Sequence, residues 1–173
     1  MKMTTTTRAI FRVQINGSID AVWNELTKQG EAQAAVFNCW LHAQVLAPGE
    51  KMQMRTGSGG YAMVVGTITA FEPPHRFAHT FRFTQHDDPE CEVTYELKQR
   101  LGGVECTLTV DKLPVGTKTA KSMEGGGNMI VNTLKAVVET GRPRFGTRLM
   151  YWLFSHMEFV LPARSKVDKW PME

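Results

Sequence analysis

Between about residues 40 and 113, short and mostly apolar segments alternate with clusters of turn-forming residues. The turns are marked by Gly57-Ser58-Gly59-Gly60, Pro73-Pro74, Asp87-Asp88-Pro89 and Gly102-Gly103. Because consecutive strands with short connections pair antiparallel, this pattern predicts an antiparallel meander. The predicted strands are 40–46, 50–56, 61–71, 76–83, 91–99 and 104–110.

After Pro114 and Gly116 the apolar residues change from a period of two to helical spacing. The stripe runs through Met123, Gly127, Ile130, Val131, Leu134, Val137 and Val138. Gly141 ends the predicted helix of about 120–141, and Pro143 follows two residues later. A sheet with one apolar face and one long amphipathic helix can bury these faces against each other.

The N-terminal part adds a strand and helices before the meander. Residues 9–15 alternate apolar and polar side chains as a half-buried strand does. Ser18 is a suitable N-cap for a helix over 19–28. We expect a second short helix in 29–38, so that two short helices follow the first strand.

Length and composition favour a single domain. The chain has 173 residues and 42% hydrophobic content, enough for one sizeable core and rather short for two. No signal-peptide pattern or membrane-spanning run is visible, which predicts a soluble, unexported protein. Three cysteines without C-x-x-C spacing favour a reducing cytoplasm over a disulfide framework or a cysteine zinc site.

The positive charge is concentrated at the C-terminal end. Residues 142–173 hold six of the 20 lysines and arginines and three of the 17 acids, so the preceding 141 residues are neutral. Nucleic-acid binding would need a basic face with reading or stacking motifs, and the sequence shows none. We therefore expect no nucleic-acid partner.

The order of elements resembles the START-like (SRPBCC) helix-grip superfamily, and local motifs resemble its subgroup of bacterial homologues of the activator of the heat-shock chaperone ATPase. The resemblance covers about residues 8–141 and implies an α+β fold, in which a curved antiparallel sheet wraps round the long helix, with a ligand cavity between them. It implies no particular reaction, because this scaffold hosts many functions. The residues that carry it are Ile19-Asp20-Ala21-Val22-Trp23, Leu26-Thr27, Trp40, Pro48-Gly49, Gly66, Ile68, Phe71-Glu72-Pro73-Pro74, Arg76-Phe77, Val93-Thr94-Tyr95-Glu96-Leu97, Thr107-Leu108-Thr109 and Leu134 through Glu139-Thr140-Gly141.

The sequence departs from the family pattern in two places. Family members usually carry a tryptophan near the start of the last helix, where this chain has Glu124-Gly125-Gly126-Gly127-Asn128. One interpretation is that Gly127 leaves room for a ligand; the other is that the helix begins later or kinks at the glycines. The chain also continues for about 30 residues beyond Gly141.

Strand alternation and the family pattern predict which side chains line the cavity. His79 shares a strand face with Phe77 and Phe81, so it would be an ionisable group in an apolar interior, either orienting a ligand or acting as a general base. It could equally be a hydrogen-bonded core histidine. The predicted cavity wall is Trp40, Met54, Met63, Phe77, His79, Phe81, Tyr95, Cys106, Gly127 and Val131.

We predict no metal, no cofactor and no catalytic residues. His75 and His79 share a strand face, but four residues along a strand separate them by about 13 Å, too far to share a metal. The remaining histidines lack ligand-type spacing, and no nucleophile, triad or acid–base pair is evident.

Residues 142–173 form an extension with an apolar helix at about 146–160. Its apolar residues cover most of its circumference, so it cannot lie freely in water. It could pack on its own domain, where it could cap the cavity, or form a homodimer interface. A membrane surface is the less favoured third location.

The leading hypothesis is a protein that binds a small hydrophobic or aromatic molecule between sheet and long helix. The second is an enzyme of the cyclase or hydrolase kind that uses His79 as its acid–base group. The third is a chaperone ATPase regulator, suggested only by the subgroup's name. The sequence favours binding over catalysis.

Overall fold

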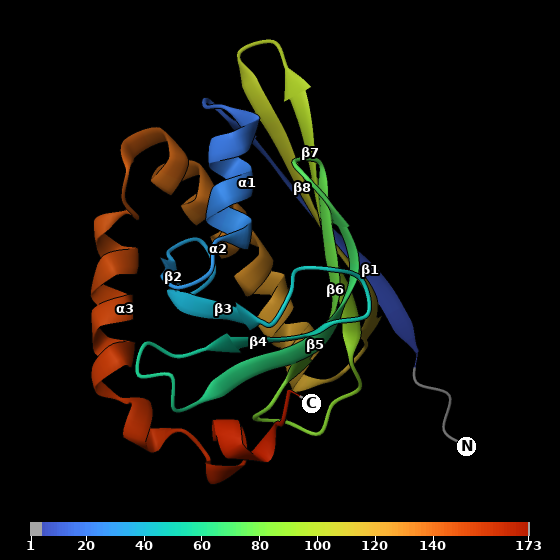
Figure 1. Cartoon of the computed structure of the whole chain (residues 1–173), viewed down its shortest axis with the longest axis vertical. Coiled ribbons are helices and arrows are strands. Elements are labelled where there is room, and N and C mark those ends of the chain that lie inside the picture. The colour runs from blue at the N-terminus through green and yellow to red at the C-terminus, as the bar shows by residue number, and fades with distance from the viewer. Residues whose placement is uncertain (1–4, 173) are drawn as a thin grey trace.

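The computed structural model describes residues 5–172 and confirms the α+β architecture of a curved antiparallel sheet around a long helix (Figure 1). Eight strands form one sheet in the order β1-β8-β7-β6-β5-β4-β3-β2, with every adjacent pair antiparallel. The N-terminal strand therefore closes the meander by pairing with the last one. The strands are β1 (Thr6–Ile15), β2 (Ala32–Gln33), β3 (Cys39–Ala43), β4 (Lys51–Arg55), β5 (Ala62–Glu72), β6 (Arg76–Phe83), β7 (Cys91–Arg100) and β8 (Gly103–Pro114).

The core lies between the inner face of this sheet and α2 (Lys118–Thr140), which packs against β1 and β8. Alternate residues of β8 are fully buried, as a half-buried strand requires: Val104, Cys106, Leu108 and Val110. On α2, Val131 and Leu134 belong to the same core cluster. Burying each such side chain contributes about 1.5–3 kcal/mol to the stability of the fold.

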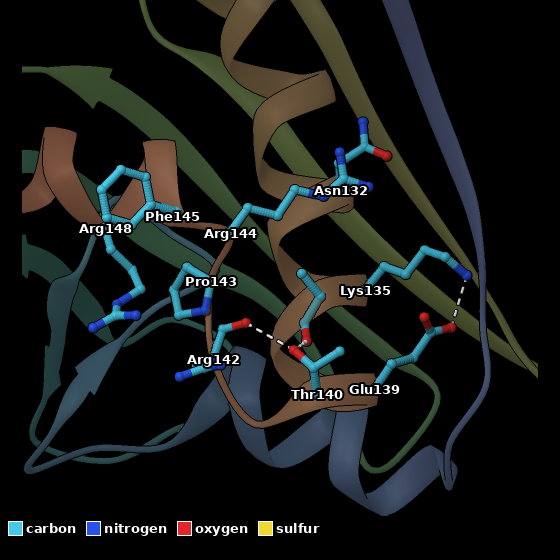
Figure 2. A pocket seen from close by; sticks show the side chains of 10 residues that line it. Asn132, Lys135, Glu139, Thr140, Arg142, Pro143, Arg144, Phe145 and Arg148 are labelled. Carbon is cyan, nitrogen blue, oxygen red and sulfur yellow. Dashed lines mark hydrogen bonds and ion pairs between the residues drawn. The ribbon is translucent and has the colours of Figure 1, made fainter.

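Both ends of α2 are capped, and the C-terminal cap is the predicted Gly141. The hydroxyl of Thr117 accepts a hydrogen bond from the Ala120 amide at 3.1 Å. Gly141 follows the last turn with a φ of 78°, a left-handed conformation that glycine adopts without strain. Thr140 donates across this turn to the carbonyl of Arg142 at 3.1 Å (Figure 2). The helix begins at Lys118 and is continuous through Gly125, Gly126 and Gly127, so the interpretation that it begins later, at the glycines, is wrong.

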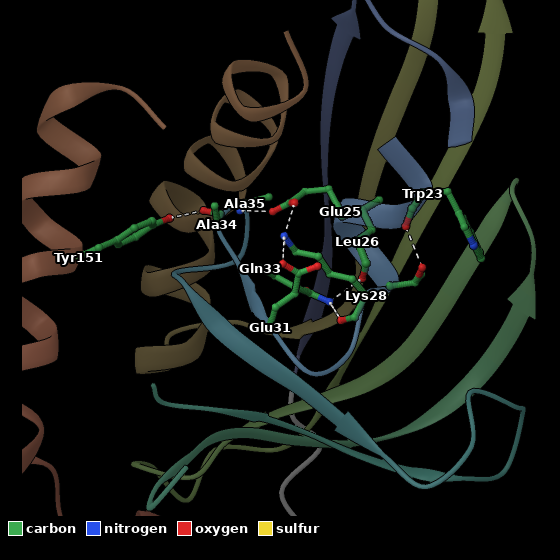
Figure 3. A network of polar contacts seen from close by, with 10 residues as sticks. Trp23, Glu25, Leu26, Lys28, Glu31, Gln33, Ala34, Ala35 and Tyr151 are labelled. Atoms are coloured by element: carbon green, nitrogen blue, oxygen red, sulfur yellow. Dashed lines mark hydrogen bonds and ion pairs between the residues drawn. The ribbon is translucent and has the colours of Figure 1, made fainter. Parts of the chain in front are cut away.

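The N-terminal helix α1 (Ile19–Thr27) begins as predicted, with the Ser18 hydroxyl accepting from the Ala21 amide at 3.1 Å. The second short helix predicted within 29–38 is wrong, because this segment forms β2 and a turn. The amide of Gln33, 1% exposed, donates to the Leu26 carbonyl at 3.0 Å and so fixes an extended path past α1 (Figure 3). Glu25 likewise accepts from the backbone amide of Ala35 at 3.1 Å. These tertiary hydrogen bonds override the local helical preference.

The C-terminal extension forms α3 (Phe145–His156) and three short 3-10 helices, η1 (Glu158–Val160), η2 (Ala163–Ser165) and η3 (Val167–Lys169). The predicted helix at 146–160 is therefore real but ends as an α-helix at His156. The segment after it lies against the outer face of the sheet, opposite to α2. There the Thr84 and Ser165 hydroxyls are 2.8 Å apart, and the Val167 amide donates to the Gly60 carbonyl at 3.0 Å.

The three cysteines, Cys39, Cys91 and Cys106, are free and buried. Within residues 5–172, no helix is long and apolar enough to cross a membrane. The same residues contain no group of three or more histidine, cysteine or acidic side chains that could hold a metal ion.

Candidate functional site

An aromatic cluster lies on the inner face of the sheet and consists of Phe77, His79 and Phe81 of β6 and Tyr95 of β7. The register pairs Phe77 with Tyr95 and His79 with Val93, so the four side chains of the cluster point to the inner face of the sheet. On this face α2 packs against β1 and β8, and α1 packs against β7 and β8. The three aromatic residues belong to one core cluster with Val131 of α2.

The side chains of the aromatic cluster are in mutual contact. The His79 ring centroid lies 5.3 Å from that of Phe77 and 6.4 Å from that of Phe81. Phe77 and Tyr95 stack across the two strands with centroids 6.5 Å apart and planes 14° apart. These separations lie within the 4.5–7 Å range of favourable aromatic pairs. The imidazole is therefore enclosed by apolar rings.

His79 is 5% exposed, and its Nδ1 lies 2.8 Å from the carbonyl oxygen of Thr80. Because a carbonyl only accepts hydrogen bonds, Nδ1 carries the proton and Nε2 is the acceptor of a neutral ring. Burial lowers the pKa of His79 to about 4, outweighing the Thr80 hydrogen bond and the Glu92 charge, which act in the opposite direction. Among residues 5–172, no group hydrogen-bonds Nε2. A neutral ring with one unpartnered acceptor thus sits in the core.

Tyr95 supplies a second polar atom on the same face. The residue is 5% exposed, and no described group hydrogen-bonds its hydroxyl. Burial raises the pKa of Tyr95, so the hydroxyl stays protonated and able to donate. Tyr95 lies on β7 opposite Phe77, and His79 is the next inward-facing residue after Phe77 on the adjacent strand β6. Among the described residues, Arg82 Nε is the only fully buried side-chain nitrogen or oxygen without a hydrogen-bond partner. The His79 Nε2 and the Tyr95 hydroxyl are therefore not fully enclosed, and their accessible surface on one face indicates a place for a polar ligand group or a water.

The other predicted wall residues differ in how deeply they are buried. Met54, Cys106 and Val131 are at most 6% exposed and lie in the core. Burial raises the pKa of Cys106 to about 12, so it is a neutral thiol. Trp40 is 38% exposed and alternates with the buried Leu41, so its placement on the cavity wall is wrong. Met63 is half-buried beside the irregularity in β4–β5 pairing, where its sulfur lies 3.8 Å from the Gln85 amide nitrogen.

Gly127 is buried on the face of α2 that meets β1. A Cβ added there would lie 2.2 to 2.5 Å from ring atoms of Phe11. The space left by the missing side chain is therefore filled by Phe11, which overturns the interpretation that Gly127 leaves room for a ligand. Sequence reasoning did not pair these two residues because they are distant along the chain.

Two pockets stand out on the described chain, and neither lies between the sheet and α2. One, of about 340 Å³, lies on the outer face of the sheet beside Trp170. The other, of about 530 Å³, lies where α2 meets the start of α3 (Figure 2). Sequence reasoning missed this second pocket, and the basic excess after residue 141 was its only signal. It is lined by Asn132, Lys135, Ala136, Glu139, Thr140, Arg142, Pro143, Arg144, Phe145 and Arg148.

Helix α3 closes one side of the space between α2 and the β2–β3 turn. Its only buried residue is Tyr151, whose hydroxyl donates to the Ala34 carbonyl at 2.8 Å (Figure 3). Burial raises the pKa of Tyr151, while contacts from Phe37 of the turn and Thr133 of α2 oppose that shift. One side chain therefore ties α3 to both the turn and α2.

The fold recurs in solved structures of low sequence identity. Protein MLL2253 from Mesorhizobium loti superposes with a TM-score of 0.63 at 16% identity, over 76% of this chain and 96% of that one. The Aha1 dimer from Colwellia psychrerythraea superposes with a TM-score of 0.62 at 14% identity, over 78% of this chain and 98% of that one. CalU16 from Micromonospora echinospora gives 0.59 at 14% identity and covers 92% of this chain and 98% of its own.

No curated protein matches the sequence. A family model does match, over residues 16–139, which is most of the chain and contains the whole aromatic cluster. The matched range ends before α3 and before residues 142–144, which join α2 to α3 and line the larger pocket. This chain therefore belongs to the family described as Activator of Hsp90 ATPase homolog 1-like protein.

Proposed function

We propose that the protein binds a small aromatic or apolar molecule between the sheet and α2, and that this molecule carries one hydrogen-bond donor directed at His79. The observation that carries the proposal is the neutral His79 ring, which is 5% exposed and has an unpartnered Nε2 among Phe77, Phe81 and Tyr95. Aromatic walls with few polar groups are typical of small-molecule sites. The polar atom would then set the orientation of the ligand.

The inner face supports an apolar ligand class. Besides the aromatic cluster, Met52 and Met54 of β4 are buried there, and thioether side chains adapt readily to ligand shape. Access would require a local rearrangement. Helix α3 is the element best placed to move, because Tyr151 alone anchors it in the interior.

Thermal shift with matched probes tests this proposal. A ligand that binds only the native state must raise its melting temperature. We expect 2-naphthol, which has a donor, to stabilise the protein more than naphthalene, which has none. One neutral hydrogen bond contributes about 0.5–1.5 kcal/mol, so the affinities should differ by up to about tenfold. In a His79→Leu variant, this difference should disappear.

His42 provides the matched control. It lies on β3, on the exposed face that alternates with Leu41. A His42→Leu variant should keep the preference for 2-naphthol. The proposal would be abandoned if neither probe raised the melting temperature of the wild-type protein, or if His79→Leu retained the full preference.

The alternative is an enzyme of the cyclase or hydrolase kind, and the Tyr95 hydroxyl is the observation that favours it. A neutral imidazole that accepts a proton and a hydroxyl that donates one are the two groups that acid–base catalysis needs. Conversion of an aryl ester such as 2-naphthyl acetate, lost in both His79→Leu and Tyr95→Phe, would support catalysis. Binding of 2-naphthol without any such turnover would support the binding protein instead.

A chaperone-regulating role rests on the name of the family. A pull-down with the purified chaperone tests it, and co-purification at equal stoichiometry would be the supporting result.

A further inference from the structure

Residues 145–160, which form α3 and η1, carry most of the exposed large apolar side chains of the described chain. Phe145 is 77% exposed, Trp152 58% and Phe159 80%. Helix α3 forms one flank of the molecule, with no other element on its outer side (Figure 1). The remaining exposed apolar residues of 145–160 are Leu149, Leu153, Phe154, Met157 and Val160, each at least 45% exposed.

The spacing along α3 indicates what kind of surface would cover this face. Phe145, Leu149, Trp152 and His156 follow each other at intervals of four, three and four residues. This is the spacing of a seam that packs against another helix. The inward-pointing Tyr151 lies on a different side of the helix. The seam therefore faces away from the domain.

The exposed apolar area of residues 145–160 is that of an interface. A fully exposed aromatic side chain presents about 150–250 Å², so Phe145, Trp152, Phe154 and Phe159 together leave roughly 500 Å² uncovered. Phe145 and Trp152 lie on the seam, Phe154 lies on the other side of α3 and Phe159 lies in η1. Apolar patches on monomers rarely exceed a few hundred Å² and a stable interface buries about 800 Å² per partner, so the interface would use η1 and the aliphatic residues as well as the seam.

We propose that α3 packs antiparallel against α3 of a second copy of this chain, around a two-fold axis between Leu149 and Trp152. In that arrangement Leu149 of each copy meets Trp152 of the other, and Phe145 meets His156. The partner is argued from symmetry, because one self-complementary stripe per chain satisfies a two-fold interface.

The charge distribution favours the antiparallel orientation. Arg142, Arg144 and Arg148 lie at the start of α3, whereas the Glu158 carboxylate after the helix accepts hydrogen bonds from the amide and hydroxyl of Ser58 in its own chain. An antiparallel pair places the arginines of one copy beside the carboxyl end of the other helix, where positive charge is favourable. A parallel pair would bring like charges together.

Sedimentation of the full chain tests the proposal. We expect the wild-type protein to be a dimer at micromolar concentration and Leu149→Glu to be a monomer with unchanged circular dichroism. The matched control is Leu101→Glu in the β7–β8 turn, because Leu101 is fully exposed and apart from α3. This control should remain a dimer. A monomeric wild type, or a dimeric Leu149→Glu, would overturn the proposal.

Cross-linking tests the register. The native cysteines are at most 8% exposed, so a short bifunctional maleimide should react mainly with an introduced surface cysteine. Leu149→Cys should give covalent dimers, and Leu101→Cys should not. If the wild type is instead monomeric and sediments with phosphatidylglycerol vesicles, an anionic membrane covers this face and the second-copy proposal is wrong.

Discussion

The ring of Phe11 in β1 fills the space where Gly127 of α2 would carry a Cβ, with ring atoms 2.2 to 2.5 Å from that position. The two residues belong to the first strand and the long helix, which are far apart along the chain. Their contact lets the helix approach the sheet closely. It also makes the glycine a packing requirement at a position where local preference would choose another residue.

Gly127→Ala should therefore destabilise the fold, although alanine is favoured over glycine in a helix by about 1 kcal/mol. Overpacking against Phe11 costs about 1–3 kcal/mol and should prevail. Gly125→Ala is the matched control, since nothing lies within 4 Å of a Cβ there. Urea denaturation should show a lower free energy of unfolding for Gly127→Ala and a higher one for Gly125→Ala. Equal gains in both would contradict this packing.

The pH dependence of stability should carry the signature of His79. Its pKa is about 4 in the folded protein, against an ordinary value of 6.5 for a histidine in the unfolded chain, so the unfolded chain binds the proton first as the pH falls. The contribution of the neutral His79 ring to the free energy of unfolding is fully present above pH 6.5. It is lost progressively as the pH falls from 6.5 to 4, by roughly 3 kcal/mol in total.

Denaturation curves of His79→Leu and the wild type, compared across this window, measure that loss. The free-energy difference between the two should change steeply with pH. The more exposed His42 is the control, and His42→Leu should show a much smaller change. A difference for His79→Leu that is constant with pH would mean that the ring is not buried in its neutral form.

Tyr151→Phe tests the anchor of α3. It removes the hydroxyl that donates to the Ala34 carbonyl and should cost about 1 kcal/mol. Hydrogen exchange of the amides in α3 should accelerate by about fivefold or more, while those of β8 should change little. If α3 exchanged at the wild-type rate, the Ala34 contact would not be what holds this helix in place.

Thr84→Val tests the attachment of the C-terminal segment. The Thr84 hydroxyl lies 2.6 Å from the Ala62 carbonyl oxygen and 2.8 Å from the Ser165 hydroxyl, and both oxygens are acceptors for its proton. Valine leaves the fully buried Ser165 without this partner, at a cost of about 1–3 kcal/mol. Thr56→Val, at a more exposed position, should be nearly neutral in the same thermal denaturation.

The predictable part of this fold was the part governed by local patterns. Alternation identified the strands that carry His79 and Tyr95, and helical spacing with Gly141 identified α2. The segment 29–38 was mispredicted because hydrogen bonds tie it to α1: the Gln33 amide donates to the Leu26 carbonyl, and the Ala35 amide donates to Glu25. No local pattern records such contacts.

The candidate site was predictable to the same degree. The face shared by Phe77, His79 and Phe81 follows from a period of two, and the structure places all three together. Trp40 was misplaced because it was assigned by family position instead of by its alternation with Leu41. The filling of the Gly127 space by Phe11 depends on how closely α2 approaches β1, which the sequence does not encode locally.

The state of His79 with and without a ligand tests the central claim most directly. A ¹⁵N spectrum of the imidazole at pH 7 should show a neutral ring with the proton on Nδ1. Addition of 2-naphthol should shift the Nε2 resonance as this atom accepts a hydrogen bond, and naphthalene should shift it much less. An Nε2 resonance that 2-naphthol leaves unchanged at saturation would contradict a ligand site beside His79.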